Sequence, residues 1–189
     1  NIDNWDTSKV VNMYDMFGGC LELADFDLSI LDTSKVTNMS YIFRDCTSFP
    51  ATFDISKVNT SNVTDMSGMF YECSSLEHVI INGIDTSQVT SMYNMFGYCK
   101  KLSTLDIDKI NTSSLETTNY MFHNDKLLAN IDLSKWNTIN LSNTRDMFSC
   151  EEYMSFPCNY PDDVTSFTAL KSIDLSGWDT QNLKDASDM

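Results

Sequence analysis

The sequence predicts a β-rich repeat solenoid, and three observations lead to this fold class. Pairs of an apolar residue and Phe recur along the 189 residues at spacings of 26, 27, 26, 26 and 26. The positions between the pairs repeat one order of apolar and polar residues, and a corner of the type Asp/Asn-Thr-Ser follows at a constant distance. A period of this length is typical of stacked coils. The pairs are Met16-Phe17, Ile42-Phe43, Met69-Phe70, Met95-Phe96, Met121-Phe122 and Met147-Phe148.

The first element of each coil carries the Phe of the pair. We number a coil from the residue equivalent to Met13, so that positions one, four, five and eight hold Met, Met or Ile, Phe and Cys in the early coils. Val36, Met39, Ile42 and Phe43 follow one another at spacings of three, three and one. This spacing predicts one short helical or 3₁₀ turn per coil. We expect its Met and Phe to fill the core, with the cysteines as small buried thiols.

The second element is a short strand. Residues 23–29 come to alternate apolar and polar side chains, which is typical of a strand with one buried face. A corner follows, as at Asp32-Thr33-Ser34, where short oxygen-bearing side chains can bond nearby backbone amides. One coil cannot bury its apolar side alone, so stacking of coils must complete the core.

The repeats predict a single solenoid array over residues 1–189, with coils of about 26 residues and a loop insertion at about 149–167. Met189 follows Met147 by 42 residues, which is 26 plus 16. The sequence begins in the strand part of a unit and stops one residue before the next expected Phe. We therefore expect a fragment of a longer array, or ends that contact other subunits.

Composition and charge exclude several classes of function. Asp and Glu number 27 against 12 Lys and Arg, a net charge of −15, whereas a nucleic-acid-binding surface needs cations to neutralise phosphates. No apolar run of about 18 residues occurs, so we expect no membrane insertion in this segment. The two histidines, His78 and His123, belong to no nucleophile-elbow, phosphate-loop or metalloprotease motif. We expect no enzymatic activity.

One unit can be written Met-x-x-Met-Phe-x-x-Cys-x-x-Leu-x-x-Leu-Asp-Leu-Ser-x-Trp-Asp-Thr-Ser, and residues 92–107 and 131–138 keep most of it. This motif resembles the BspA-type leucine-rich-repeat family of surface proteins. The resemblance covers nearly the whole chain, with departures at Ile80, at Asp125 and in the insertion near Cys150. Members are secreted or cell-surface proteins, usually described as adhesins. The resemblance therefore implies a leucine-rich-repeat-like solenoid in an extracellular setting, with no catalytic residues to transfer.

Position fifteen carries an Asp in most coils, and these side chains should point outward from the stacked strands. Several oxygen ligands in a row could hold calcium, and an acidic row could also face a basic partner. The alternative is a solvated face in which neighbouring Ser, Thr and Asn satisfy the carboxylates. We expect no other cofactor. The candidates for calcium or partner binding are Asp27, Asp54, Asp106, Asp132 and Asp174.

The insertion is the one non-repetitive segment, and inserted loops of repeat proteins often carry recognition. Tyr153, Phe156 and Tyr160 are candidate anchors for a partner, or else they fold back and cover the edge of a coil. Cys150 and Cys158 lie outside the Cys position and bracket this loop, so we predict a disulfide between them.

Two further patterns involve hydroxyl and amide side chains. Thr recurs at position twenty-one, where hydrogen bonding at a repeated corner explains it more simply than an ice-binding ladder does. Asn-x-Ser/Thr sequons also recur, because the repeat is rich in these residues. The sequons in predicted corners have room for a glycan, and these are Asn59, Asn62 and Asn111.

These observations together predict a non-enzymatic module for adhesion or protein interaction, located at a cell surface or secreted. Its partner would be a protein or a glycan at a cell surface or in a matrix. The alternative is an architectural subunit of an extracellular filament, appendage or coat, in which copies of the chain associate end to end. The open ends expected above suggest this second role.

Overall fold

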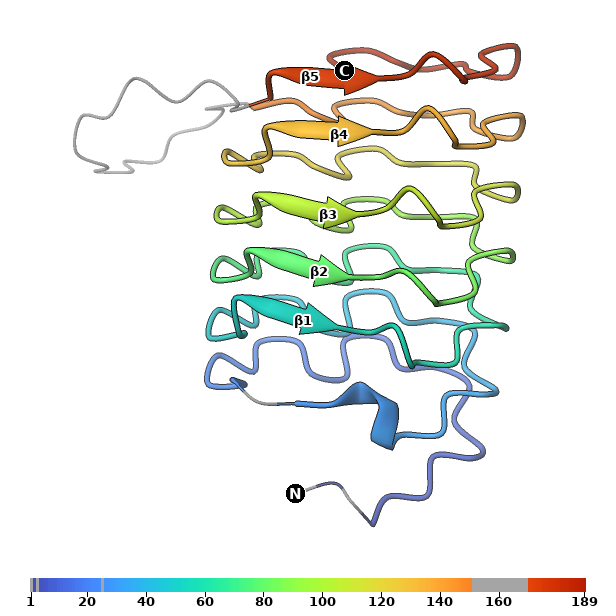
Figure 1. Ribbon diagram of the computed structural model, residues 1–189. Coiled ribbons are helices and arrows are strands. Elements are labelled where there is room, and N and C mark those ends of the chain that lie inside the picture. The colour runs from blue at the N-terminus through green and yellow to red at the C-terminus, as the bar shows by residue number, and fades with distance from the viewer. Residues whose placement is uncertain (1, 3, 25, 151–169) are drawn as a thin grey trace, which may run out of the picture.

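The computed structural model describes residues 2, 4–24, 26–150 and 170–189. The chain winds in successive coils that lie one above another, with the strands aligned on one side (Figure 1). The structure is β-rich, and helix is nearly absent from the described residues. The elements in chain order are the 3₁₀ helix η1 (Leu28–Ile30) and the strands β1 (Thr52–Asp54), β2 (His78–Ile80), β3 (Thr104–Asp106), β4 (Asn130–Asp132) and β5 (Ser172–Asp174).

The strands pair in parallel, and each pair joins equivalent positions of neighbouring coils. β1, β2 and β3 form one sheet in that order, and β4 and β5 form a second sheet. Phe53, Val79 and Ile131 at the strand centres are buried, whereas the residues that flank them in β1 and β4 are exposed. This alternation confirms the short strand predicted for these coils.

The first coil departs from its predicted strand. Residues 23–29 carry the alternating pattern, yet the chain forms η1 there. Asp27 caps this helix, because its side chain accepts a hydrogen bond from the N–H two residues later at 2.9 Å. Leu28 is fully buried, and the ring centroids of Phe26 and Phe17 lie 4.6 Å apart. The apolar side chains therefore reach the core by a different backbone path.

The short helical or 3₁₀ turn predicted for each coil is wrong, because the segment that carries the Met-Phe pair is a run of reverse turns. In the first coil the N–H groups of Met16 and Gly18 donate to carbonyls three residues earlier. The intervening N–H groups of Met13, Asp15 and Phe17 donate instead to carbonyls of the next coil. Positions three and seven have positive φ, 55° at Asp15 for example, which a right-handed helix excludes.

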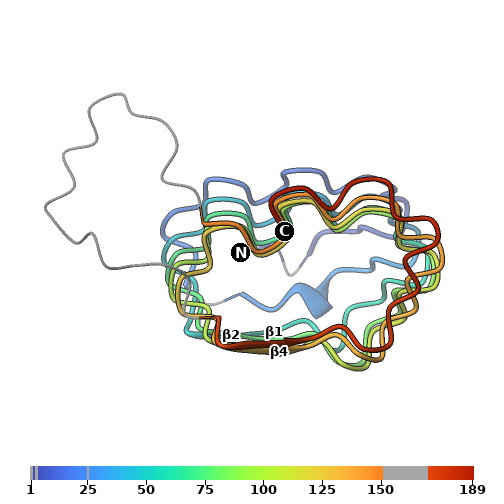
Figure 2. The same ribbon diagram turned by 90° about the horizontal axis from the view of Figure 1, so that it is seen from above.

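The core lies between two walls, with the strands on one and the turn segments on the other (Figure 2). The Phe side chains of position five form a continuous stack, in which successive ring centroids are 5.4 to 5.9 Å apart. Most of the Met side chains of positions one and four are buried beside this stack, as predicted. The stacked rings are Phe17, Phe43, Phe70, Phe96, Phe122 and Phe148.

The Thr column bonds each coil to the next. The Thr86 hydroxyl donates to the carbonyl of Asn111 at 2.9 Å and accepts the N–H of the same residue at 2.8 Å. The Thr residues of this column from Thr33 to Thr138 are at most 3 % exposed, so they form no surface ladder of the kind that ice binding needs. The residues that donate to the next coil in this way are Thr33, Thr60, Thr86, Thr112 and Thr138.

The Cys column behaves similarly within the core. Cys46, Cys73 and Cys99 are fully buried, and each Sγ donates to the carbonyl of a Phe in the preceding coil at 3.1 to 3.3 Å. Burial raises the pKa of Cys46 to about 12 and those of Cys73 and Cys99 well above the ordinary value. The prediction of buried thiols is confirmed for these three, whereas Cys20 is exposed.

Candidate interaction surface

The five Asp residues of position fifteen are exposed, as predicted, but most bond to their own backbone. In Asp27, Asp54, Asp132 and Asp174 one carboxylate oxygen accepts the N–H of the Ser two residues later at 2.8 to 2.9 Å. Hydrogen bonds from that Ser lower the pKa of Asp27, Asp54 and Asp132. These carboxylates form Asx turns that shape the bend after the strand position, in agreement with the solvated alternative.

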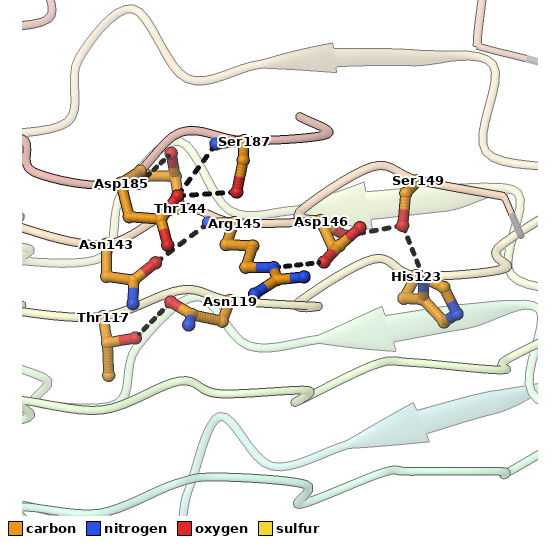
Figure 3. A network of polar contacts seen from close by, with 10 residues as sticks. All are labelled: Thr117, Asn119, His123, Asn143, Thr144, Arg145, Asp146, Ser149, Asp185 and Ser187. Carbon is orange, nitrogen blue, oxygen red and sulfur yellow. Dashed lines mark hydrogen bonds and ion pairs between the residues drawn. The ribbon is translucent and has the colours of Figure 1, made fainter.

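The same bond recurs at two other corners of the coil. At position twenty, Asp32 and Asp85 each accept the N–H of the residue two places later at 2.9 Å. Just before position one, Asn143 and Asp185 do so at 3.1 and 3.0 Å (Figure 3). Many of the Asp residues of the chain are therefore located in corners, where the side-chain oxygen of Asp or Asn accepts the same backbone hydrogen bond.

Like charges meet in one part of the Asp column. Asp54 pairs with Ile80 and Ile80 pairs with Asp106, so Ile80 separates the two carboxylates in the first sheet. In the second sheet Asp132 and Asp174 are direct partners. Directly opposed like charges destabilise a strand pair. The repulsion between Asp132 and Asp174 therefore destabilises the second sheet, and Ile80 prevents such a contact in the first sheet.

A groove of about 320 Å³ between η1 and β1 brings two of the predicted residues together. Asp27 and Asp54 both line it, beside Lys57. The Lys57 ammonium adds to the effect of the Ser hydrogen bonds in lowering both carboxyl pKa values. This end of the strand wall therefore has mixed charge, and the remaining lining residues are Ala24, Phe26, Pro50, Thr52 and Phe53.

The geometry offers no support for calcium binding. Within the described ranges, no three His, Cys, Asp or Glu side chains lie together in a way that could hold a metal ion. Calcium takes six to eight oxygen ligands around one point, whereas the Asp side chains of the strand wall are distributed along the stack.

His78 lies on the strand wall. Asp106 has no Ser two residues later, and the imidazole of His78 is its neighbour instead. Its Nδ1 is 2.8 Å from the Oγ1 of Thr104, and its Nε2 is 3.8 Å from the Oδ2 of Asp106. The three residues belong to the paired strands β2 and β3. This cross-strand cluster was not predicted, because His78 is the one His at its position of the repeat and no recurring pattern pointed to it.

His123 is buried in a polar network of the turn wall (Figure 3). Its Nδ1 is 2.7 Å from the Oγ of Ser149, and its Nε2 is 2.7 Å from the Nδ2 of Asn124. With this amide orientation Nε2 accepts, so Nδ1 carries the proton toward Ser149. The Ser149 hydroxyl donates to the carbonyl of Asp146 at 3.2 Å.

Asp125 occupies the Cys position of its coil and is 4 % exposed. One oxygen accepts the N–H of Cys99 at 2.9 Å, while Oδ2 has no hydrogen-bond partner among the described residues. Burial raises the carboxyl pKa well above its ordinary value. The sequence showed this residue as a break in the column, but a buried carboxyl with an unsatisfied oxygen was not foreseen.

The predicted glycosylation sites differ in their hydrogen bonding. Asn59, Asn62 and Asn111 are all exposed at corners of the coil. The Nδ2 of Asn62, the atom that would carry a glycan, already donates to the carbonyl of Ser34 at 2.7 Å. Asn59 and Asn111 use their side-chain oxygen in Asx turns, which leaves glycosylation compatible with those bonds.

The candidates in the insertion lie outside the described residues. These are Tyr153, Phe156, Tyr160 and Cys158. Cys150 is described and is half-buried, so its disulfide with Cys158 stays a prediction.

Comparison with known proteins gives a family. The model of the family described as "Mycoplasma protein of unknown function, DUF285" matches residues 1–82 and 50–159, and the chain belongs to this family. No curated protein and no solved structure matches the chain. In the part of the chain that the structure describes, no helix has the length and hydropathy needed to cross a membrane.

Proposed function

We propose that this chain is a non-enzymatic cell-surface or secreted repeat protein that mediates adhesion or protein–protein interaction. In this proposal its fold is a leucine-rich-repeat-like solenoid of the BspA type. Support for the fold comes from parallel pairing between equivalent positions of successive coils, such as Thr52 with His78. Support for the extracellular setting comes from the resemblance of the repeat motif to surface proteins.

The observation that carries the proposal is the strand wall. Stacking in register places equivalent side chains of successive coils next to one another, as with Asp132 and Asp174. Exposed residues flank the buried centres of β1 and β4 and the half-buried centres of β3 and β5. A wall with repeated exposed polar side chains suits the recognition of an extended partner, because stacked repeats create long binding surfaces.

The test is binding of fluorescently labelled chain to intact cultured animal cells. The variant Asp54→Asn/Asp132→Asn/Asp174→Asn removes three charges from the strand wall but keeps the oxygen that caps each turn. We expect it to bind cells at least about tenfold more weakly, since charge complementarity is lost. Trypsin treatment of the cells should abolish binding to a protein ligand, and deglycosylation should abolish binding to a glycan.

The matched control is Asp32→Asn/Asp85→Asn/Asp179→Asn, which removes three charges from the position-twenty corner and also keeps the capping oxygens. It should bind cells as the parent chain does. Failure of the parent chain to bind any cell contradicts the proposal. End-to-end polymers in analytical ultracentrifugation, without cell binding, would favour the architectural role instead.

A further inference from the structure

The turn segments form the wall opposite the strands (Figure 2). A row of aromatic side chains follows these segments from coil to coil. Neighbouring rings meet edge to face, with centroids 5.1 to 6.5 Å apart. The aromatic row crosses five coils without a gap between successive rings, and at the fifth coil it turns back to Tyr93 of the fourth. It consists of Tyr14, Tyr41, Tyr71, Tyr98, His123, Tyr120 and Tyr93, in spatial order.

Three of these rings occupy backbone positions that disfavour large side chains. Tyr41, Tyr98 and Tyr120 have φ of 58°, 63° and 58°, in the left-handed region. Other coils place Gly68 and Asn124 at equivalent positions, with φ of 58° and 61°. A bulky side chain there costs backbone energy, and such outliers are a reason to look for function.

The aromatic row is open to solvent at several points. Tyr14 is 57 % exposed and Tyr93 is 37 % exposed, while Tyr41, Tyr71 and Tyr98 are half-buried. The rings do not belong to the hydrophobic core, which the Met and Phe side chains fill from the other side of the same segments. The edge-to-face contacts hold the rings in place before any partner arrives.

The charges around the first three rings are mainly negative. Asp15, Asp45, Asp65 and Glu72 supply four carboxylates, against the single guanidinium of Arg44. That guanidinium is already paired, at 3.2 Å from Asp15 and 2.7 Å from Asp45. Burial and hydrogen bonding to Glu72 raise the pKa of Tyr71, so its ring stays a neutral phenol. The surroundings thus attract cations to a surface of neutral aromatic rings.

We propose that the aromatic row binds an extended Lys- or Arg-rich segment of a partner protein. Aromatic faces attract ammonium and guanidinium groups, and the net negative charge of the rim steers them to the wall. The repeated spacing of the rings suits an extended segment that offers a cation at intervals. This inference rests on the proposed role in protein interaction, but it assigns the contact to the turn wall rather than to the strand wall.

The probe is a fluorescein-labelled dodecapeptide of alternating Lys and Ser, with binding followed by fluorescence anisotropy. The variant Tyr14→Ser/Tyr41→Asn/Tyr98→Asn removes three rings and no charge. Asn adopts positive φ readily, so the variant should fold, and a melting curve checks this. We expect at least about tenfold weaker binding, since each cation–π contact contributes a share of the affinity.

The control is again Asp32→Asn/Asp85→Asn/Asp179→Asn, which removes three negative charges at a distance from the aromatic row. We expect it to lose less than about threefold in affinity. A loss in this control as large as that in the Tyr variant would show that the rings contribute no more to binding than remote charges do, and that result overturns the proposal. An unchanged affinity of the Tyr variant overturns it as well.

An uncharged oligosaccharide, cellohexaose, separates the two classes of partner. Binding of cellohexaose that depends on the tyrosines, without binding of the peptide, would reassign the aromatic row to glycans and overturn the proposal. Failure of this proposal for the aromatic row can be told apart from failure of the proposed function. In that case cell binding would depend on Asp54, Asp132 and Asp174, while the Tyr variant would bind cells normally.

Discussion

Position eight of the coil shows how much one side chain changes the environment of the core. In the three coils before Asp125 a buried thiol at this position donates to a carbonyl of the preceding coil, as Cys99 does to Phe70 at 3.1 Å. Asp125 has no proton to donate when ionised, and its Oδ2 lacks a partner among the described residues. An unsatisfied buried charge destabilises a folded protein, so the ionised form of Asp125 is a local weakness.

Replacing Asp125 by the Cys of the other coils should stabilise the protein at pH 7 by about 1–3 kcal/mol. Because burial raises the folded-state pKa of this carboxyl, its penalty grows as the pH rises above the ordinary value of 3.8 and vanishes below it. The gain from Asp125→Cys should therefore shrink between pH 7 and pH 4.5. Urea unfolding at the two pH values measures this difference.

The control for this prediction is Asp125→Asn, which keeps an acceptor for the N–H of Cys99. This variant should also be more stable than the parent chain at pH 7, and its stability should lack the pH-dependent penalty that ionised Asp125 imposes. A variant that gains the same amount at both pH values would show that volume, rather than ionisation, is the cause.

At the scale of elements, the turn segment shows why the helix prediction failed. A helix and a run of reverse turns both bring positions one, four and five to one side, so apolar spacing does not separate them. Positive φ at positions three and seven does separate them. The sequence did contain this signal, since Gly19, Gly68, Asn94 and Asn124 stand at those positions and are typical of the left-handed region.

The corner that contains Thr86 should contribute more to stability than the half-buried Thr90 on the same coil. The variant Thr86→Val leaves both the N–H and the carbonyl of Asn111 without their partner, and we expect a loss of about 1–3 kcal/mol. The matched variant Thr90→Val removes one exposed hydrogen bond of 3.2 Å to Thr64 and should cost less than about 1 kcal/mol. Urea midpoints compare the two, and equal losses would contradict the role given to the doubly bonded corner.

For the whole molecule, the many capped carboxylates predict a characteristic response to acid. Hydrogen bonds from a nearby Ser lower the pKa of these groups in the folded state. They therefore add stability above their unfolded pKa, and that stability is lost as the pH falls through the folded pKa. The groups are Asp6, Asp27, Asp32, Asp54, Asp85, Asp132 and Asp185.

We expect maximal stability at mildly acidic pH. Asp125 favours a lower pH, whereas the capped carboxylates oppose any pH below about 4. Far-UV circular dichroism during urea unfolding, repeated from pH 7 to pH 2.5, measures the curve. The variant Asp54→Asn/Asp132→Asn, which removes two of the carboxyls with a lowered pKa, should lose less stability below pH 4 than the parent chain. An equal loss would contradict the role given to these capped carboxylates.

The strand positions and the buried columns could be predicted from the sequence because each coil repeats the same spacing of apolar residues. The parts that failed depend on contacts between coils or on local backbone choice. Residues 23–29 have a strand pattern, but packing of Phe26 on Phe17 accompanies η1. The aromatic row was missed because its members come from four different positions of the repeat, so no single column in the sequence contains them.

The alternation of hydrogen bonds in the turn segment has a mechanical consequence. Every second N–H, from Met13 to Gly19, points to the next coil, so these bonds run along the direction of stacking. Each coil contacts its neighbours alone, so the junctions carry a tensile force along that direction in series and rupture one at a time. The chain should therefore lengthen under tension in steps of single coils, at lower force than if it were pulled along its strands.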